Sequence, residues 1–539
     1  MKKAMSISHL ISPLRSLNRR HFLRLLGGAG SAWLLAACAA PEPASSSPAP
    51  VEAAVTAGPR RGGTLRLAFS ELPISFDPAF FGGYVDTIMG VAVYEALSWI
   101  DPADPAQTLQ PRLAESWEAN DDYTSWTFKL RPGVEFHHGT PFTARDVVYT
   151  FERILDPALG SPAATIFLFV DAVVAVDDLT VRFDLSVPHA HLPKWLIPEN
   201  FAYIEPHDLS GEQIASHPSG TGPFRFVSYD PGSRTTLARN ETYWHEELPY
   251  LDEVQHLYIT DANTQVAVLT SGELDVMTQV GLANRVSLEQ APGIDLIELP
   301  RGSYDVFAMN CQMAPFDDVR VRQALKLAVD RPGLRQVVLG GKGELGADQP
   351  FPPFSPFWDG TPPPERNVEK ARELLAAAGY PNGVEVTMIT TDISPGLVDA
   401  SVALQEMVKA AGINITLERV PPDAYWVDYY RQAQMYISYW STRVDPAADL
   451  VLGFHPDGYY NDANWQNPEM VPLLDEARES ADAEKLMDVY ARIQTLIQTD
   501  GGVIIPYFRP LVVAKRSQVQ GLIPDIVTFD VRAAWLTEA

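Results

Sequence analysis

Cysteine is almost absent from this chain, which has two, Cys38 and Cys311, in 539 residues. So few cysteines exclude a cysteine metal cluster. Cys311 ends the apolar stretch 307–311, and no histidine stands near it in the sequence to activate a thiol. We therefore expect a small buried thiol at this position, and no internal disulfide if Cys38 is modified.

Basic residues are also in short supply, with 41 Lys and Arg against 68 Asp and Glu, which gives a formal net charge of −27. A surface this negative repels phosphate backbones and anionic headgroups, so nucleic acid is not an expected partner. The hydrophobic share of 46% is normal for a globular protein, and 539 residues suit two or three packed lobes rather than one core.

Long apolar runs are missing too. The most apolar segment, residues 25–37, is shorter than the roughly 20 residues that a helix needs to cross a bilayer. It follows Arg19-Arg20 and ends in Leu35-Ala36-Ala37-Cys38, which has the form of a lipoprotein processing site. We expect residues 1–37 to be an export signal and Cys38 to carry the lipid. The arginine pair resembles a twin-arginine signal, with general secretion as the alternative route.

Residues 38–60 follow this site and consist mostly of Ala, Pro, Ser and Gly. Such a composition cannot bury a core and predicts a disordered tether. Together, the two segments predict a protein outside the cytoplasm, anchored to the cell membrane by lipid. Whether it lies in a periplasm or on an outer face is left open.

The first half of the body, through about Pro300, has the sequence pattern of a strand-rich lobe. Alternating apolar and polar residues predict strands at 63–69 and 126–130, and a hairpin over 173–185 that turns at Asp177-Asp178. Residues 144–155 predict one of its few helices.

After about residue 306 the texture changes to alternating helices and strands. A helix is expected to begin at Asn367, and the segments that follow predict strand 384–388, helix 397–411, strand 413–417 and strand 435–440. Strand, helix and strand in succession make a βαβ unit and hence a parallel pair. Two lobes of different texture predict a cleft between them, where ligands usually bind.

Four segments carry recognisable motifs. They are KLRPGVEFHHGTPFTARDV at 129–147, GTGPF at 220–224 leading to RNETYW at 239–244, DVRVRQA at 318–324, and Trp440 with Asp445-Pro446. In this order they resemble the family 5 solute-binding proteins, which serve ABC importers of peptides, nickel complexes and related solutes. The resemblance spans about residues 61–535.

The residues of these motifs favour structural roles. Prolines and glycines in the first and second motifs are turn formers, and Thr143 is placed to cap the helix that follows it. Arg320 and Arg322 stand beside Asp317 and Asp318, with which we expect them to pair.

The resemblance implies an α/β protein with the two-lobed periplasmic-binding-protein fold, type II, and an extra subdomain in the first lobe. The first lobe would comprise residues 61–305, the second 306–500, and residues 501–539 would return to the first. The crossings would lie near residues 304–310 and 501–507. A peptide or similar small organic solute would bind between the lobes, and an ABC permease and ATPase complex would receive it. We expect a monomer with no cofactor and no metal.

Arg443 departs from the pattern of the peptide-binding relatives, in which an acidic residue three places after the tryptophan holds the peptide amino group. A buried guanidinium needs an anionic partner. Either the ligand supplies that anion, or Arg443 pairs with a neighbour such as Asp445 or Asp449. With the gap placed differently, Asp445 would instead meet an amine.

Aromatic residues are further candidates for the ligand site, because they supply apolar walls with polar tips. Core packing is the alternative for each. The candidates are Tyr84, Tyr304, Tyr439, Trp440 and Tyr459.

Two patterns are set aside. Gly341, Gly343 and Gly346 form GxGxxG, but a proline-rich loop follows rather than the helix that dinucleotide binding needs. Two pairs of histidines, His137 with His138 and His189 with His191, lack a third ligand at the spacing of a metal site. We therefore expect these histidines at the surface or in turns.

Two other functions remain as alternatives. An exported hydrolase using paired carboxylates would fit the many acids, although no nucleophile motif supports it. A sensory receptor subunit would share the fold and differ in its partner.

Overall fold

The computed structural model describes residues 58–101, 104, 108–300, 303–441, 443, 446–525 and 529–537. The predicted signal, Cys38, most of the predicted tether and Asp445 lie outside these residues. Within the described part of the chain, no helix is both long and apolar enough to cross a membrane.

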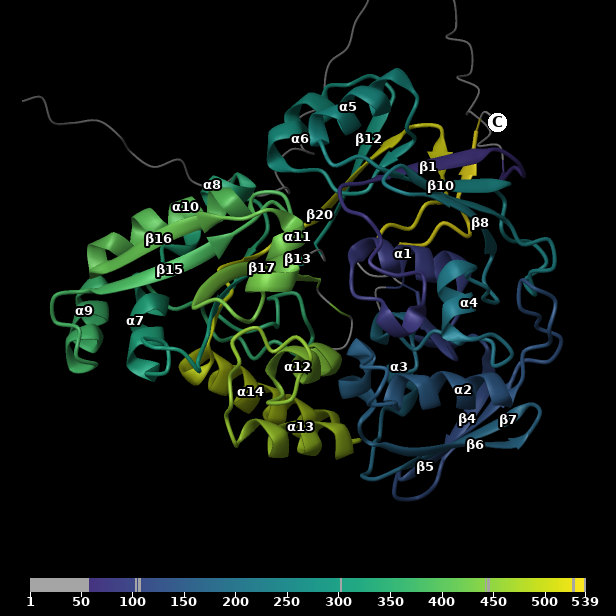
Figure 1. Cartoon of the computed structure of the whole chain (residues 1–539), viewed down its shortest axis with the longest axis horizontal. Helices are drawn as coiled ribbons and strands as arrows, with labels where there is room; N and C mark the ends of the chain where they lie inside the picture. Colours follow the sequence, from purple (N-terminus) through teal and green to yellow (C-terminus); the bar gives the residue numbers. More distant parts are fainter. Residues whose placement is uncertain are drawn as a thin grey trace, which may run out of the picture. The chain divides into compact units, whose positions relative to one another are not determined.

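A seven-stranded sheet, called here the first sheet, is built around the predicted first strand of the body. Its strands in spatial order are β12 (Ile294–Leu299), β20 (Leu511–Arg516), β11 (Val276–Met277), β1 (Thr64–Phe69), β10 (Glu253–Tyr258), β9 (Arg234–Arg239) and β8 (Phe224–Asp230). Figure 1 shows β20, in yellow, running beside β12. The strand predicted at 63–69 is thus confirmed as β1, which pairs in parallel with β10 and β11.

Both faces of the first sheet are covered, because successive side chains of a strand point to opposite faces. Leu65, Leu67 and Phe69 of β1 lie in the large core that also contains α1 (Tyr84–Val93). Ala68 points the other way, into a smaller core with residues of α5 (Ala262–Ser271) and α6 (Leu282–Glu289).

A four-stranded antiparallel sheet forms a separate layer. Its strands come between β1 and β8 in the sequence. Its order is β4 (Ala114–Ala119), β5 (Ser125–Leu130), β7 (Thr180–Leu185) and β6 (Val170–Asp177). The predicted hairpin is confirmed by β6 and β7, and the predicted helix by α2 (Ala144–Leu155). Thr143 and Asp146 form a capping box at the start of α2. The same region holds β2 (Ser98–Ile100), β3 (Leu109–Pro111), α3 (Leu192–Trp195) and α4 (Gly211–Ser216).

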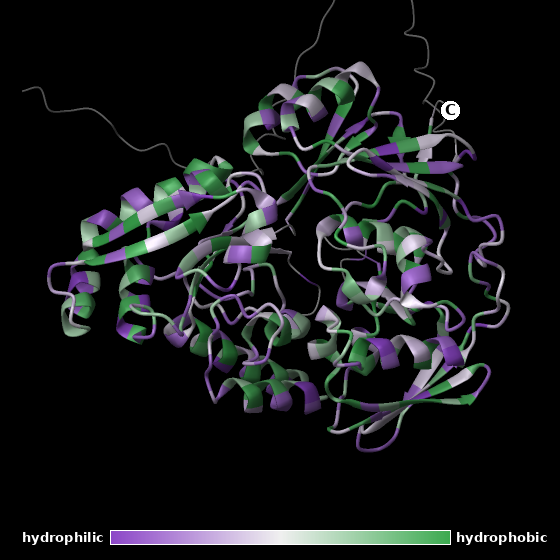
Figure 2. Cartoon of the chain, in the orientation of Figure 1, coloured by the Kyte–Doolittle hydropathy of each residue, from purple (hydrophilic) through white to green (hydrophobic). Residues whose placement is uncertain are grey.

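The second sheet contains the predicted βαβ unit. Its strands are β14 (Glu344–Leu345), β19 (Tyr507–Phe508), β13 (Ser303–Met309), β17 (Met435–Ser441), β15 (Val384–Thr390) and β16 (Ile413–Arg419), with β18 (Val503–Ile504) also paired to β13. β15 and β16 are parallel, and α10 (Leu397–Val408) joins them, as predicted. α10 buries residues 397, 400, 404 and 408, and Figure 2 shows the bands of green and purple that such a one-sided helix produces.

The remaining elements of the second half pack around this sheet or extend beyond it. They are α7 (Val319–Ala328), α8 (Arg331–Leu339), α9 (Val368–Ala377), α11 (Pro422–Ala424), α12 (Pro446–Phe454), α13 (Met470–Glu479), α14 (Ala483–Asp500), β21 (Val519–Gln520) and β22 (Trp535–Leu536). Asn367 caps α9, as the sequence predicts. The GxGxxG segment contains β14 and no helix, in agreement with the rejection of a dinucleotide site.

The chain passes between the two sheets twice, after β12 and after β19. Arg509 follows β19 directly, and its Nε donates to Asp305 Oδ1 at 2.7 Å. Its backbone N–H donates to Ser303 O at 2.7 Å, so one arginine ties both crossing segments together. The chain therefore moves from one sheet to the other a few residues outside the predicted limits 306–500. As boundaries of the lobes, these limits remain predictions.

Three motif segments meet around Gly220 and Gly222. His137 donates its backbone N–H to Gly220 O at 2.9 Å, and Asn240 Nδ2 donates to Gly222 O at 3.0 Å. Gly222 N–H in turn donates to Val93 O at the end of α1, at 2.9 Å. The first two motifs are therefore parts of one backbone junction, which explains their spacing without a ligand.

We expect Gly220→Ala to lower the free energy of unfolding by about 3 kcal/mol. A Cβ at this position would lie 2.1 Å from the backbone oxygen of Val93, which cannot move as a side chain would. Urea denaturation measures the loss. Gly281→Ala is the matched control, because its Cβ would meet only Pro395 at an ordinary 3.5 Å. Equal losses in the two variants would contradict the packing argument.

His256 of β10 is a buried polar residue without a hydrogen bond. Neither ring nitrogen has a partner among the described residues, and the ring packs against Phe69 with centroids 4.9 Å apart. Burial lowers the pKa of His256 from 6.5 to about 3. The folded chain therefore keeps the imidazole neutral where the unfolded chain takes up a proton.

We expect His256→Leu to raise the free energy of unfolding at pH 7 by about 1–3 kcal/mol, because it removes unsatisfied polar atoms. The parent protein should also lose stability as the pH falls from 6.5 towards 3, since only its unfolded state binds the extra proton. Denaturation of both proteins at pH 7, 6 and 5 measures the gap, which should widen with acid. A gap independent of pH would contradict the assignment.

Candidate functional site

A cavity lies where the two sheets meet. It is lined by Ser70, Glu71, Tyr84, Gln279, Ser303, Ile393, Ser394, Tyr439 and Ser441. Ser70 and Glu71 follow β1, Tyr84 begins α1 and Gln279 follows β11, while Ser303, Tyr439 and Ser441 belong to β13 and β17 of the second sheet. The cavity has room for about one water molecule, so the two sides are nearly closed on each other.

Glu71 is the one charged side chain among these lining residues. It lies near the start of α1 and lines the same cavity as Tyr439 of β17. The two residues belong to opposite sides of the cavity. Burial, with a smaller contribution from Asp86, raises the pKa of Glu71 to about 7.

Asp86 is a second carboxyl at the same helix start. It is fully buried and accepts the backbone N–H groups of Ile74 at 2.8 Å, Gly82 at 3.2 Å and Gly83 at 3.0 Å. Burial raises the pKa of Asp86 to about 6 although these hydrogen bonds lower it. Asp86 thus lies at the start of α1, which favours negative charge, and close enough to Glu71 to raise the pKa of that residue.

The predicted tyrosines fall into two groups, those that line the cavity and those that do not. Tyr84 and Tyr439 line the cavity. Tyr304 is buried and packs edge-on against Phe508, with ring centroids 5.4 Å apart, and Tyr459 is 43% exposed. Neither of these two lines the cavity. Their roles in ligand binding therefore stay predictions.

The side chain of Trp440 is hydrogen-bonded to a buried acid. Its indole N–H donates to Asp462 Oδ2 at 2.9 Å, and the Tyr430 hydroxyl donates to Asp462 Oδ1 at 2.6 Å. Burial raises the pKa of Asp462 to about 6. The network fixes the orientation of the indole and occupies both carboxylate oxygens.

Arg443 forms an ion pair with Asp449, one of the two neighbours that the sequence offers. Its Nε donates to the backbone oxygen of Glu199 at 3.0 Å, and the guanidinium lies 5.5 Å from the centroid of the Phe201 ring. The side chain is 9% exposed and does not line the cavity. Arg443 therefore bridges a segment after β17 to the region of α3 in the first half.

A further contact of this kind involves α13. His191 Nε2 lies 2.8 Å from the backbone oxygen of Ser480, and Ala190 N–H donates to the Arg478 oxygen at 3.1 Å. These bonds accept at backbone oxygens. They join the two halves through residues that do not line the cavity.

A larger cavity, of about 310 Å³, lies elsewhere. It is lined by residues between Arg335 and Pro363, including Phe351 and Trp358, and all of them belong to the second half. Because only one side of the fold contributes, closure of two lobes cannot act there. The smaller cavity between the sheets is the better candidate for the functional site.

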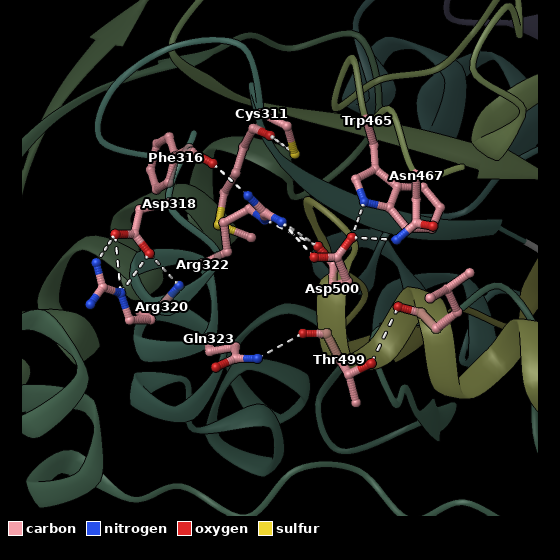
Figure 3. Close-up of polar contacts among 12 residues, drawn as sticks. Cys311, Phe316, Asp318, Arg320, Arg322, Gln323, Trp465, Asn467, Thr499 and Asp500 are labelled. Atoms are coloured by element: carbon pink, nitrogen blue, oxygen red, sulfur yellow. Dashed lines mark hydrogen bonds and ion pairs between the residues drawn. The ribbon is translucent and has the colours of Figure 1, made fainter. Parts of the chain in front are cut away.

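The motif at 318–324 has a structural role (Figure 3). Arg320 pairs with Asp318, as predicted. Arg322 does not pair locally: its Nη2 bonds Asp500 Oδ1 at 3.1 Å, and its Nη1 donates to the Phe316 oxygen at 2.8 Å. The prediction for Arg322 was wrong because α7 turns this residue towards the end of α14. Cys311 is a buried free thiol beside this network, as expected.

The histidine pairs form no metal site among the described residues, where no group of three or more potential ligands occurs. His138 bonds Ser219 Oγ at 2.6 Å in a turn. His189 is buried against Phe169 and Trp195, so the expected surface or turn position was wrong for it.

We expect Arg443→Met to lower the free energy of unfolding by about 3 kcal/mol, because it leaves the buried Asp449 carboxylate without its guanidinium. Arg419→Met is the matched control, since the pair of Arg419 with Asp392 is exposed and should be worth less than about 1 kcal/mol. Chemical denaturation compares the two. Similar losses would mean that the Arg443 pair does not stabilise the fold.

Comparison with known proteins gives one consistent result. The family described as "Bacterial extracellular solute-binding proteins, family 5 Middle" matches residues 108–461, more than half of the chain. The heme-binding protein A of Haemophilus influenzae is 31% identical over 505 residues, covering 87% of this chain and 90% of that protein. The glutathione-binding protein GsiB of Pectobacterium atrosepticum is 28% identical over 442 residues, covering 79% and 85%.

Solved structures agree with the sequence relatives. The ABC transporter-associated periplasmic binding protein DppA from Helicobacter pylori, in complex with the peptide STSA, superposes with a TM-score of 0.80. It is 26% identical, and the match covers 89% of this chain and 99% of DppA. The predicted two-lobed α/β fold of the periplasmic binding proteins is confirmed. By these matches, the chain belongs to the family 5 bacterial extracellular solute-binding proteins.

Proposed function

We propose that this chain is the substrate-binding component of an ABC importer, which captures a peptide or similar small organic solute and delivers it to the permease and ATPase complex. The observation that supports this function best is the cavity between the sheets, with walls from both lobes and mostly polar side chains. The similar proteins are named for heme, glutathione and peptide binding, all small organic solutes.

The binding step follows from how the cavity is built. A solute that touches both walls stabilises the closed arrangement, while one that touches a single wall does not shift the equilibrium between open and closed forms. Micromolar affinity would require about 8 kcal/mol of net binding free energy.

Catalysis is not needed to explain the site. The lining residues include four serines, but no histidine that could activate one of them, and a single carboxyl rather than a catalytic pair. The family itself is one of binding proteins. These observations favour capture over turnover.

The proposal includes the route of the chain to its place of work. Residues 1–37 would direct export by the twin-arginine route, and Cys38 would then carry the lipid anchor outside the cytoplasm. The segment after it would tether a monomeric binding body to the membrane surface. The sequence pattern at residues 35–38 supports this part of the proposal.

We expect the protein, purified without denaturation, to carry a small organic solute in native mass spectrometry. Added at about one hundred times its Kd, the same solute should stabilise the protein by about 2.7 kcal/mol, because it binds the folded state alone. Thermal unfolding measures this shift, and X-ray scattering measures whether the lobes close. A rigid body with no bound solute and no thermal shift from peptide libraries would contradict the proposed function.

A further inference from the structure

We propose that the larger cavity, in the second half of the chain, is a separate binding site for a small aromatic carboxylate. Such a site goes beyond solute capture between the lobes, because every residue that lines this cavity belongs to one side of the fold. Its basis is the size of the cavity, its walls and its charge.

The cavity has the size and the walls of a small-molecule site. Its volume of about 310 Å³ lies at the lower end of the range of about 300–1,000 Å³ for pockets that hold small organic ligands. Most of its walls are apolar, with Leu345, Ala347, Phe351, Trp358 and three prolines. Aromatic and proline rings present flat apolar surfaces, which suit a flat ring in the ligand.

The two aromatic side chains differ in what they already contact. Phe351 is buried, and its ring packs against Tyr490 with the centroids 5.4 Å apart. Trp358 is half-buried, and no aromatic ring of a described residue packs against it. The indole of Trp358 therefore offers the cavity an aromatic surface that a ligand ring can cover, in the offset or edge-on arrangement that such pairs prefer.

Arg335 of α8 brings positive charge to the cavity. Its Nη1 donates to Gly343 O at 3.0 Å, while its Nε is buried without a hydrogen-bond partner among the described residues. It forms no ion pair with an Asp or Glu of the described part of the chain. A guanidinium has five N–H donors and binds a carboxylate through two parallel hydrogen bonds. A ligand carboxylate would thus supply the anion that Arg335 lacks.

Glu344 is the other charged residue of the lining. It lies on β14, the edge strand of the second sheet, and is exposed, whereas Arg335 is half-buried. Water and salt screen an exposed charge more than a partly buried one. Arg335 therefore decides which charge the cavity attracts, and Glu344 weakens that attraction without reversing it.

The walls of the cavity are held in place by the rest of the second half. Gln498 Nε2 of α14 donates to Ala347 O at 3.1 Å and to Pro362 O at 3.4 Å, so one side chain fixes two walls. Gly346, which lies between two lining residues, donates its backbone N–H to Pro506 O at 3.0 Å. Because these bonds form without a ligand, little of the binding free energy is lost in ordering the site.

The experiment titrates the whole protein with 3-phenylpropionate and with its neutral amide, 3-phenylpropanamide, in a calorimeter at pH 7. The two probes share the ring, so the carboxylate should bind about 10- to 100-fold tighter, as expected for charge-assisted hydrogen bonds. Arg335→Met should remove this difference. Arg419→Met is the matched control and should keep it, because Arg419 is exposed, pairs with Asp392 and does not line the cavity.

A second variant tests the aromatic wall. Trp358→Leu should weaken the binding of both probes by about 2- to 10-fold, since the aromatic pair is lost. Equal affinity of the parent protein for the two probes, or binding of neither, would overturn the inference even if Arg335→Met fails to fold. Unchanged binding of 3-phenylpropionate by both variants would also overturn it. Capture of a solute between the lobes is measured separately by native mass spectrometry, so the proposed function stands in each of these outcomes.

Discussion

A charge that leaves water needs a partner, and this requirement decides most of the structure around the meeting of the two lobes. Arg443 has Asp449, Arg509 has Asp305, and Asp462 is bonded by Tyr430 and Trp440. Each of these groups is satisfied within the chain. Glu71 is the exception among them, because no described Lys, Arg or His pairs with it and burial raises its pKa to about 7.

The same requirement explains why the family motifs carry no ligand chemistry. Glu95 is buried near the start of β2, and its carboxylate accepts bonds from Tyr243 at 2.9 Å and Trp244 at 2.8 Å, both from the RNETYW motif. Arg112 pairs with Glu95 at 2.6 Å and lies over the Trp244 ring. These residues form a bonded cluster in which the Glu95 charge is paired with Arg112. They identify the family and leave its solute undetermined.

The elements that could be predicted are those that depend on short sequence patterns. The helix 144–155, the hairpin of β6 and β7, and the β15–α10–β16 unit depend on periodicity and caps over short stretches, and all are confirmed. Glu71 was missed, since its place in a cavity depends on Ser303, Tyr439 and Ser441 of the second sheet, which are far from it in the sequence. One signal was present: Glu71 stands just after β1, and ligands in α/β folds often bind beyond strand ends. Arg322 shows the reverse error, because its nearest acids in sequence are not its partners in space.

The position of Glu71 also bears on the order of binding and closure. It follows β1 of the first lobe, so its place on that wall does not depend on the second lobe. Tyr439 belongs to β17 of the second lobe and faces the same cavity only when the lobes are closed. A solute that binds the first wall would thus meet Tyr439 last. Because the two walls are nearly closed on each other without solute, the empty protein can close too, and the solute's contribution must come from contacts that the two walls do not make with each other.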